Sequence, residues 1–297
     1  MLQKRLLLIV NPLSGQAKMN TKLLKVVEIF SSADYSVTVY PTKAKGDATN
    51  HCLTLSDNDY DIIVVCGGDG TLNEVITGIM QKGLNIPLGY IPAGTLNEWS
   101  SGLKISRNIE IAAKDILTGQ RIRLDIGKFG DKYFSYTSSF GAFTSASYSA
   151  PQDVKNVLGQ AAYFFEGIKS LAAIKPIRLK CSYEQGEVEG EFLFGAISNS
   201  MSVGGIVKYD KSAVALNDGQ FEVLLIRNPD NLLKLQPIID GILKHEFDRE
   251  GIVFFKTQKL SIETEESLPW TLDGEFAETN GEIGISNVHN AITFIVP

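Results

Sequence analysis

Three short segments of the sequence carry the residue types that bind phosphate groups. Glycine lets the backbone approach a ligand closely, and N–H groups near the start of a helix bind phosphate oxygens. The hydroxyl and amide side chains in these segments add further hydrogen-bond partners. Together they predict a site for the phosphates of a nucleotide. The segments are Asn11-Pro12-Leu13-Ser14-Gly15, Gly67-Gly68-Asp69-Gly70-Thr71 and Pro92-Ala93-Gly94-Thr95-Leu96-Asn97.

Each segment, taken alone, has a simpler interpretation as a tight turn between a strand and a helix. The run from Gly67 to Gly70 goes beyond what a turn needs, because glycine loses more conformational entropy on folding than any other residue. The pattern lacks the Gly-Lys-Ser or Gly-Lys-Thr of a Walker loop, and it also lacks the G-x-G-x-x-G fingerprint of dinucleotide-binding domains. A phosphate site of another kind is therefore expected.

Carboxylates could supply the rest of the chemistry of phosphoryl transfer, which needs charge neutralisation and a group that accepts a hydroxyl proton. Asp69 lies among the glycines, where Mg²⁺ would offset its repulsion from phosphates. The alternative for Asp69 is a cap of a helix beginning near Thr71. Near the end of the chain, Leu272-Asp273-Gly274-Glu275 follows an apolar stretch that could raise the pKa of a carboxylate. Either Asp273 or Glu275 could then accept the proton.

The elements that would position the glycine segments alternate between strands and helices over about the first 125 residues, as in a parallel sheet with crossover helices. Each glycine segment directly follows an expected strand, so all three would meet at the carboxyl edge of the sheet. Helices are expected around Leu23 to Phe30, with Asn20 or Thr21 as cap, and around Ile109 to Leu117, ended by Gly119. The expected strands are Leu6 to Val10, Val37 to Tyr40, Ile62 to Cys66 and Leu88 to Ile91.

After Arg123 strand-like segments follow one another, which predicts a second, mainly antiparallel domain. Glu184-Gln185-Gly186 would join two of these strands as a hairpin, and helices are expected near 157–173 and 232–243. The first of these helices is either core or a wall of an acyl-chain pocket. The last expected strand, Ile292 to Val296, could belong to either domain. The other expected strands are Tyr133 to Ser138, Ile177 to Tyr183, Glu187 to Ile197, Phe221 to Ile226 and Val253 to Phe255.

Composition and charge exclude several classes of protein. The 297 residues carry 28 Lys and Arg against 34 Asp and Glu, so a net charge of −6 provides no general field for nucleic acid. Three widely spaced cysteines form neither a metal knuckle nor a disulfide framework. No stretch reaches the roughly 18 apolar residues of a membrane span, and Leu6 to Val10 is too short for a signal peptide. We expect a cytoplasmic protein that meets membranes only peripherally and transiently.

The sequence resembles the catalytic family of the diacylglycerol kinases, and among them the soluble bacterial lipid kinases related to sphingosine and ceramide kinases. The resemblance runs from Asn11 to Glu275 and lies in four segments that occur in the family's order. It implies an α/β fold in which a Rossmann-like nucleotide-binding domain with a parallel sheet, residues 1–125 and 289–297, is joined to an antiparallel β-sandwich, residues 126–288. The segments are Asn11 to Gly15, Gly67 to Val75, Pro92 to Asn97 and Leu272 to Glu275.

The resemblance also implies a function: an ATP- and Mg²⁺-dependent kinase of phospholipid metabolism that phosphorylates a hydroxyl of diacylglycerol or a related lipid at the membrane surface. In the family the Glu of the last motif, here Glu275, accepts the proton. A structural Mg²⁺ would lie at Ala215, Asp218 and Gln220, where Asn217-Asp218-Gly219 could equally be a hairpin turn. The implied ATP site comprises Asn11, Pro12, Leu13, Ser14, Gly15, Thr42, Gly67, Gly68, Asp69, Gly70, Thr71, Leu72, Asn73 and Thr95, with Asn97 as a further partner.

Two other functions stay open on the residues alone. Gly67 to Thr71 is shared with NAD kinases, so a kinase for a small molecule is the first alternative. The second is a nucleotide- or lipid-binding module without catalysis, because Glu98 stands where the family has an Asp and could weaken Mg²⁺ binding. The sequence does not specify the acceptor lipid.

Overall fold

The computed structural model describes residues 3–14, 18–95, 97–141, 175–199, 202–203, 207–208, 216–229, 231 and 234–297. The chain forms two compact units, the first made of Met1–Ile126 with Asn290–Pro297 and the second of Gly127–His289. It passes into the second unit within β5 (Gln120–Phe129) and returns within β17 (Glu282–Val296). Gly15, Ala215 and the helix expected at 157–173 lie outside the described residues.

The first unit contains a parallel sheet in the order β2-β1-β3-β4, and the end of β17 adds to β4 in parallel, with Phe294 opposite Leu88. The apolar runs of β1 and β3 are buried on both faces, which is why they read as continuous hydrophobic stretches. All four strands expected here are confirmed. They are β1 (Lys4–Val10), β2 (Tyr35–Pro41), β3 (Ile62–Gly67) and β4 (Leu88–Pro92).

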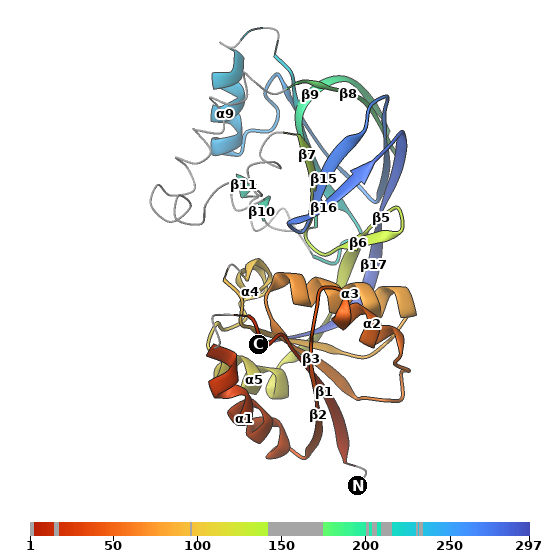
Figure 1. The fold of residues 1–297 in the computed structure, drawn as a ribbon. Helices are drawn as coiled ribbons and strands as arrows, with labels where there is room; N and C mark the ends of the chain where they lie inside the picture. Colours follow the sequence, from red (N-terminus) through yellow and green to blue (C-terminus); the bar gives the residue numbers. More distant parts are fainter. Residues whose placement is uncertain are drawn as a thin grey trace. The chain divides into compact units, whose positions relative to one another are not determined.

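Helices cover both faces of this sheet, with α1 and α5 packed together on one face and α2 and α3 on the other (Figure 1). The expected caps of the first helix are wrong, because Asn20 and Thr21 lie inside α1, which begins at Lys18. No helix among the described residues is long and apolar enough to cross a membrane. The helices are α1 (Lys18–Ser31), α2 (Asp47–Leu53), α3 (Asp69–Lys82), α4 (Glu98–Gly102) and α5 (Ile109–Thr118).

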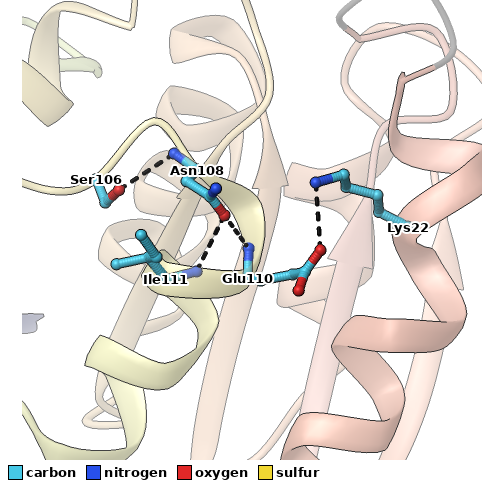
Figure 2. A network of polar contacts seen from close by, with 5 residues as sticks. All are labelled: Lys22, Ser106, Asn108, Glu110 and Ile111. Atoms are coloured by element: carbon cyan, nitrogen blue, oxygen red, sulfur yellow. Dashed lines mark hydrogen bonds and ion pairs between the residues drawn. The ribbon is translucent and has the colours of Figure 1, made fainter.

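The start of α5 shows how polar contacts fix a helix in this unit (Figure 2). The side-chain oxygen of Asn108 accepts from the backbone N–H of Glu110 at 3.0 Å and of Ile111 at 3.3 Å, a cap worth about 1 kcal/mol. The Glu110 carboxylate lies 3.3 Å from Lys22 of α1, an exposed pair that contributes little. Gly119 ends the helix as expected, and a Cβ there would lie 2.3 Å from the carbonyl oxygen of Val296.

The second unit is mainly antiparallel, and β9 is its central strand. The first half of β9 pairs with β8, and the second half pairs with β7 on one side and β12 on the other. The hairpin expected at Glu184-Gln185-Gly186 joins β8 to β9. The expected helix near 232–243 is α9 (Leu235–Lys244). The strands are β6 (Lys132–Phe134), β7 (Thr137–Gly141), β8 (Ile177–Tyr183), β9 (Gly186–Ser198), β10 (Ser202–Val203), β11 (Val207–Lys208), β12 (Phe221–Arg227), β13 (Ile252–Thr257), β14 (Lys259–Thr264), β15 (Leu268–Leu272) and β16 (Glu275–Thr279).

Aromatic side chains form the core of this unit. The Trp270 ring meets Phe129 and Phe140 edge-on, at centroid distances of 4.9 and 4.8 Å, and its N–H donates to the Thr279 hydroxyl at 3.0 Å. Edge-to-face pairs are favourable because the positive edge of one aromatic ring meets the negative face of the other. The α/β architecture with a second, β-rich unit is thus the fold class expected from the sequence.

One strand prediction is wrong. Tyr133 to Ser138 do not form a single strand, because the chain turns at Ser135 and Tyr136 between β6 and β7. The backbone N–H groups of Ser135, Tyr136 and Thr137 all donate to the carboxylate of Asp273 instead of to a neighbouring strand. A contact with a residue more than 130 positions away therefore overrides the local β propensity.

Candidate functional site

The three glycine segments meet at the carboxyl ends of β1, β3 and β4. The backbone N–H of Asn11 donates to the Cys66 carbonyl at 2.9 Å, and the N–H of Ala93 donates to the Gly67 carbonyl at 2.8 Å. The Asn11 side chain donates to the Thr71 hydroxyl at 3.1 Å. These bonds fix the three loops to one another. This arrangement is the one expected for loops that follow neighbouring parallel strands.

Gly94 must be a glycine where the second and third loops touch. A Cβ on Gly94 would lie 2.6 Å from the Cα of Gly68, and one on Gly68 would lie 3.4 Å from the Cα of Gly94. Any side chain at Gly94 would therefore push the loops apart. At this point glycine serves a close approach of two backbones rather than a turn.

The side chain of Asn97 holds the third loop in shape. Its oxygen accepts from the Gly94 N–H at 3.0 Å, its amide donates to the Gly94 carbonyl at 2.7 Å, and the Tyr90 hydroxyl lies 3.1 Å from the same oxygen. Asn97 is 3% exposed and has a left-handed φ of +50°. Burial raises the pKa of Tyr90, and the negative charge of Asp69 raises it further. Asn97 thus shapes the loop from within.

A cavity of about 320 Å³ opens at these loops. It collects residues that are far apart in the sequence, and seven of them belong to the ATP site that the sequence implies. A volume of this size lies at the lower end of the range for ligand pockets. The lining residues are Asn11, Leu13, Ser14, Thr42, Lys43, Ala44, Lys45, Gly68, Gly70, Thr71 and Glu74.

The remaining described residues of the implied ATP site are not among the residues that line this cavity. Leu72 is fully buried in the core, and a Cβ on Gly67 would lie 2.8 Å from that of Thr71. The oxygen of the Asn73 side chain is buried, whereas Thr95 is exposed. Pro12 is half-buried beside Leu13. For Glu98 the structure describes only the backbone, at the start of α4.

Glu74, Lys43 and Lys45 also line the cavity, although the sequence motifs assign none of them to the ATP site. The Glu74 carboxylate accepts from the N–H groups of Gly46 at 2.8 Å and Ala48 at 3.3 Å, so it caps α2 from the neighbouring helix α3. Asp47 accepts from the Lys43 N–H at 2.8 Å, a bond that lowers the pKa of its carboxyl. The carboxylates of Glu74 and Asp47 thus both accept backbone hydrogen bonds, and Lys43 and Lys45 line the cavity.

Asp69 is the first residue of α3, and the cap position belongs to Gly68. The interpretation of Asp69 as a cap is therefore wrong. One oxygen of its carboxylate is buried. A carboxylate in the first turn also interacts favourably with the helix dipole, yet the buried oxygen and the neighbouring cavity fit a metal-phosphate site.

The carboxylates of Asp273 and Glu275, both in the second unit, have different surroundings. Asp273 is 8% exposed, and its oxygens accept from Tyr136 at 3.0 Å, from Thr137 at 2.9 Å and from Ser135. Burial raises the pKa of Asp273 to about 7, and the three donors act in the opposite direction. Glu275, in contrast, is exposed at the start of β16. Asp273 anchors the turn that carries Glu275.

The segment implied for a structural Mg²⁺ forms a turn that leads into β12. An oxygen of Asp218 accepts from the N–H of Gln220 at 3.0 Å, and the Asn287 amide donates to the Gln220 carbonyl at 3.2 Å. The Lys256 ammonium lies 2.9 Å from Glu222 and 3.9 Å from Asp218. Over the described ranges, no three His, Cys, Asp or Glu side chains are grouped to hold a metal. A carboxylate and a carbonyl are hard oxygen donors of the kind Mg²⁺ takes, and waters would complete its shell.

Comparisons with known proteins agree on one family. A model of the diacylglycerol kinase catalytic domain matches residues 5–129. The diacylglycerol kinase of Bacillus subtilis (strain 168) is 30% identical over 275 residues, which cover 92% of this chain and 90% of that protein. The diacylglycerol kinase of Staphylococcus saprophyticus is 31% identical over 276 residues, 93% of this chain and 90% of that protein.

Solved structures give the same result. A crystal structure of a diacylglycerol kinase from Bacillus anthracis str. Sterne aligns with a TM-score of 0.77 and 25% identity, over 100% of this chain and 98% of that chain. A second crystal structure from the same organism aligns with a TM-score of 0.81 and 28% identity, over 99% and 95% of the two chains. The resemblance seen in the sequence motifs is confirmed.

Proposed function

The chain belongs to the diacylglycerol kinase family and is a lipid kinase, and from this premise we propose that it transfers the γ-phosphoryl group of ATP to a hydroxyl of diacylglycerol, with Mg²⁺. The observation that carries the proposal is the cavity at the carboxyl ends of β1, β3 and β4. Its walls combine glycine backbone, the hydroxyls of Ser14 and Thr71 and the charges of Lys43 and Lys45, all suited to a polyphosphate.

In this proposal the first unit binds the nucleotide. The loops at Asn11 to Ser14 and Gly67 to Thr71 hold the phosphates through backbone N–H groups and hydroxyls, and Thr42 and Lys43 also line the cavity. Asp69 is the residue that would hold Mg²⁺ against the phosphates. When bound, Mg²⁺ supplies neutralisation of the charge that develops on the transferred phosphoryl group.

The second unit supplies the proton acceptor. The lipid hydroxyl oxygen forms a bond to the γ-phosphorus, the bond from that phosphorus to the leaving oxygen of ADP breaks, and the hydroxyl proton passes to a carboxylate. Glu275 takes this role, because the Asp273 carboxylate is already committed to three backbone donors. Asp273 is a positioning residue that holds the turn before Glu275.

Two further parts of the proposal concern the surroundings of the reaction. Ala215, Asp218 and Gln220 would hold a structural Mg²⁺ in the second unit, with Asp218 as the charged ligand. The acceptor lipid resides in a membrane, so the kinase contacts the membrane surface peripherally from the cytoplasm while it works.

Glu275→Gln tests the assignment of the base. The variant keeps size and hydrogen bonding but loses basicity, so kcat should fall by at least about a hundredfold while ATP still binds. Glu278→Gln, on the same strand and also exposed, is the matched control and should retain activity. Normal turnover by Glu275→Gln would refute the assignment.

Asp69→Ala tests the assignment of the metal-binding carboxylate. Turnover should be lost with the fold intact, as followed by circular dichroism. Glu110→Gln removes a first-turn carboxylate from α5 and is the control for the loss of a helix-dipole interaction away from the cavity. Full activity of Asp69→Ala with only about 0.5–1 kcal/mol less stability would reduce Asp69 to a helix-dipole residue.

A further inference from the structure

The second unit contains a cavity of its own, of about 390 Å³, beside the end of β12 and the start of α9. It shares no lining residue with the cavity at the glycine loops. Its polar lining comprises Arg227, Asn228, Lys234, Glu191 and Glu250. The proposed kinase reaction uses none of these residues.

Arg227 is held in place before any ligand arrives. Its guanidinium lies over the ring of Phe192, 5.1 Å from the centroid, and donates to the Glu189 carbonyl at 3.2 Å. Gly190 has a φ of +148°, and a Cβ there would lie 2.8 Å from a guanidinium nitrogen. The space for the arginine thus depends on a glycine. A side chain fixed in this way loses little entropy when a ligand binds.

The two carboxylates that line the cavity, Glu191 and Glu250, both have polar partners. An oxygen of Glu191 accepts from the Asn228 amide at 3.0 Å, and Glu250 lies 3.5 Å from the Lys234 ammonium. Within the described parts of the chain, no carboxylate lies at ion-pair distance from Arg227. The guanidinium has five N–H donors, and among the described residues only the Glu189 carbonyl accepts a hydrogen bond from them, which leaves donors for a ligand.

We propose that this cavity binds a phosphate group through Arg227, with Lys234 as a second cation at the rim. A planar guanidinium matches the oxygens of a phosphate monoester or diester with two parallel hydrogen bonds. The group belongs either to a soluble phosphorylated molecule or to the head group of an anionic phospholipid. The site shares no residue with the proposed active site and does not require it.

Inorganic phosphate titrated into the full chain tests the site, with binding read by calorimetry and by the rise of the unfolding temperature. We expect saturable binding that weakens at least about tenfold in Arg227→Gln, since hydrogen bonds to charged groups are lost. Arg178→Gln is the matched control, because Arg178 is an exposed arginine of the same unit that pairs only loosely with Glu189, at 3.9 Å. Equal binding by wild type and Arg227→Gln, or equal weakening in Arg178→Gln, would overturn the proposal.

A second variant removes the risk that Arg227→Gln simply unfolds. Glu250 is 89% exposed at its side chain, so Glu250→Gln should fold normally. It removes the ion pair of Glu250 with Lys234 and a negative charge from the rim, and phosphate should bind several-fold more tightly. Unchanged or weaker binding in this variant would also overturn the proposal.

Vesicles distinguish the two sources of phosphate. Sedimentation with phosphatidylcholine vesicles, with and without phosphatidylglycerol, is compared for wild type and Arg227→Gln. Loss of binding to the anionic vesicles in the variant identifies a lipid head group as the ligand. Loss of phosphate binding alone identifies a soluble phosphorylated molecule.

Discussion

Replacing Gly94 with alanine should disturb the phosphate site by a distance that the structure specifies. The new Cβ would lie 2.6 Å from the Cα of Gly68 and 2.8 Å from the side-chain oxygen of Asn97. Carbon atoms rest about 3.5 Å apart, so the two loops must separate by about 1 Å. Asn97 cannot yield freely, because Tyr90 and both polar backbone groups of Gly94 hold its amide.

The expected magnitudes follow from that separation. Overpacking of this kind costs about 1–3 kcal/mol, which lowers the unfolding temperature by about 3–10 °C in a unit of this size. A displacement of about 1 Å at groups that position a substrate lowers kcat/KM by about a hundredfold. Activity should therefore suffer more than stability.

The assay combines thermal unfolding with steady-state kinetics on ATP and diacylglycerol in mixed micelles. Gly102→Ala is the control, since nothing lies within 4 Å of a Cβ at that position and the residue belongs to the neighbouring helix α4. It should leave both measurements unchanged. Wild-type kinetics for Gly94→Ala would refute the argument that the two loops must touch in order to bind phosphates.

The remaining predictions concern charge. Lys43→Gln and Lys45→Gln should each raise the KM for ATP several-fold with kcat preserved, and the ATP affinity of the double variant should depend less on salt. Lys25→Gln on α1 is the control. An unchanged KM in the two variants would exclude both lysines from the nucleotide site. Glu222 is 1% exposed, and burial raises its pKa to about 7, so the folded state binds more protons than the unfolded state between about pH 4 and 7. Stability should then fall as pH rises through that window, with a contribution from Glu222 of up to about 1.4 kcal/mol per pH unit. Glu222→Gln should reduce this slope in urea titrations, and an identical pH profile would contradict the assigned pKa. Mg²⁺ should raise the unfolding temperature of the wild type, and Asp218→Ala should remove part of that rise, whereas an identical Mg²⁺ response would place no metal at Asp218.

Local patterns predicted the parts of the fold that depend on buried strands and their loops. The runs Leu6 to Val10 and Ile62 to Cys66 are continuously hydrophobic, as is typical of strands in a parallel sheet covered on both faces. The glycine loops directly follow these strands. The cavity confirms that residues from the first two segments meet. The sequence pattern sufficed here because each element is specified by its own residues.

Local sequence patterns did not predict contacts between residues that are far apart in the sequence. Asp273 interrupts the expected strand at Tyr133 to Ser138, because its carboxylate accepts hydrogen bonds from three backbone N–H groups that are more than 130 positions away in the sequence. Glu74 of α3 caps the start of α2, and the sequence of α2 itself does not indicate this contact. The fixed position of Arg227 depends on Gly190 and Phe192 in another strand. In each case the partner becomes visible only after the chain has folded.

The most direct test of the proposed function follows the γ-phosphate itself. Wild-type protein is incubated with ATP labelled at the γ-phosphate, Mg²⁺ and vesicles that carry diacylglycerol, a sphingoid base, ceramide or phosphatidylglycerol, and the lipid extract is then separated. Label should appear in phosphatidic acid in the diacylglycerol sample, it should require Mg²⁺, and it should fall at least about a hundredfold in Glu275→Gln. Label in none of the lipids, or label transferred to NAD in a reaction without lipid, would contradict the proposed function.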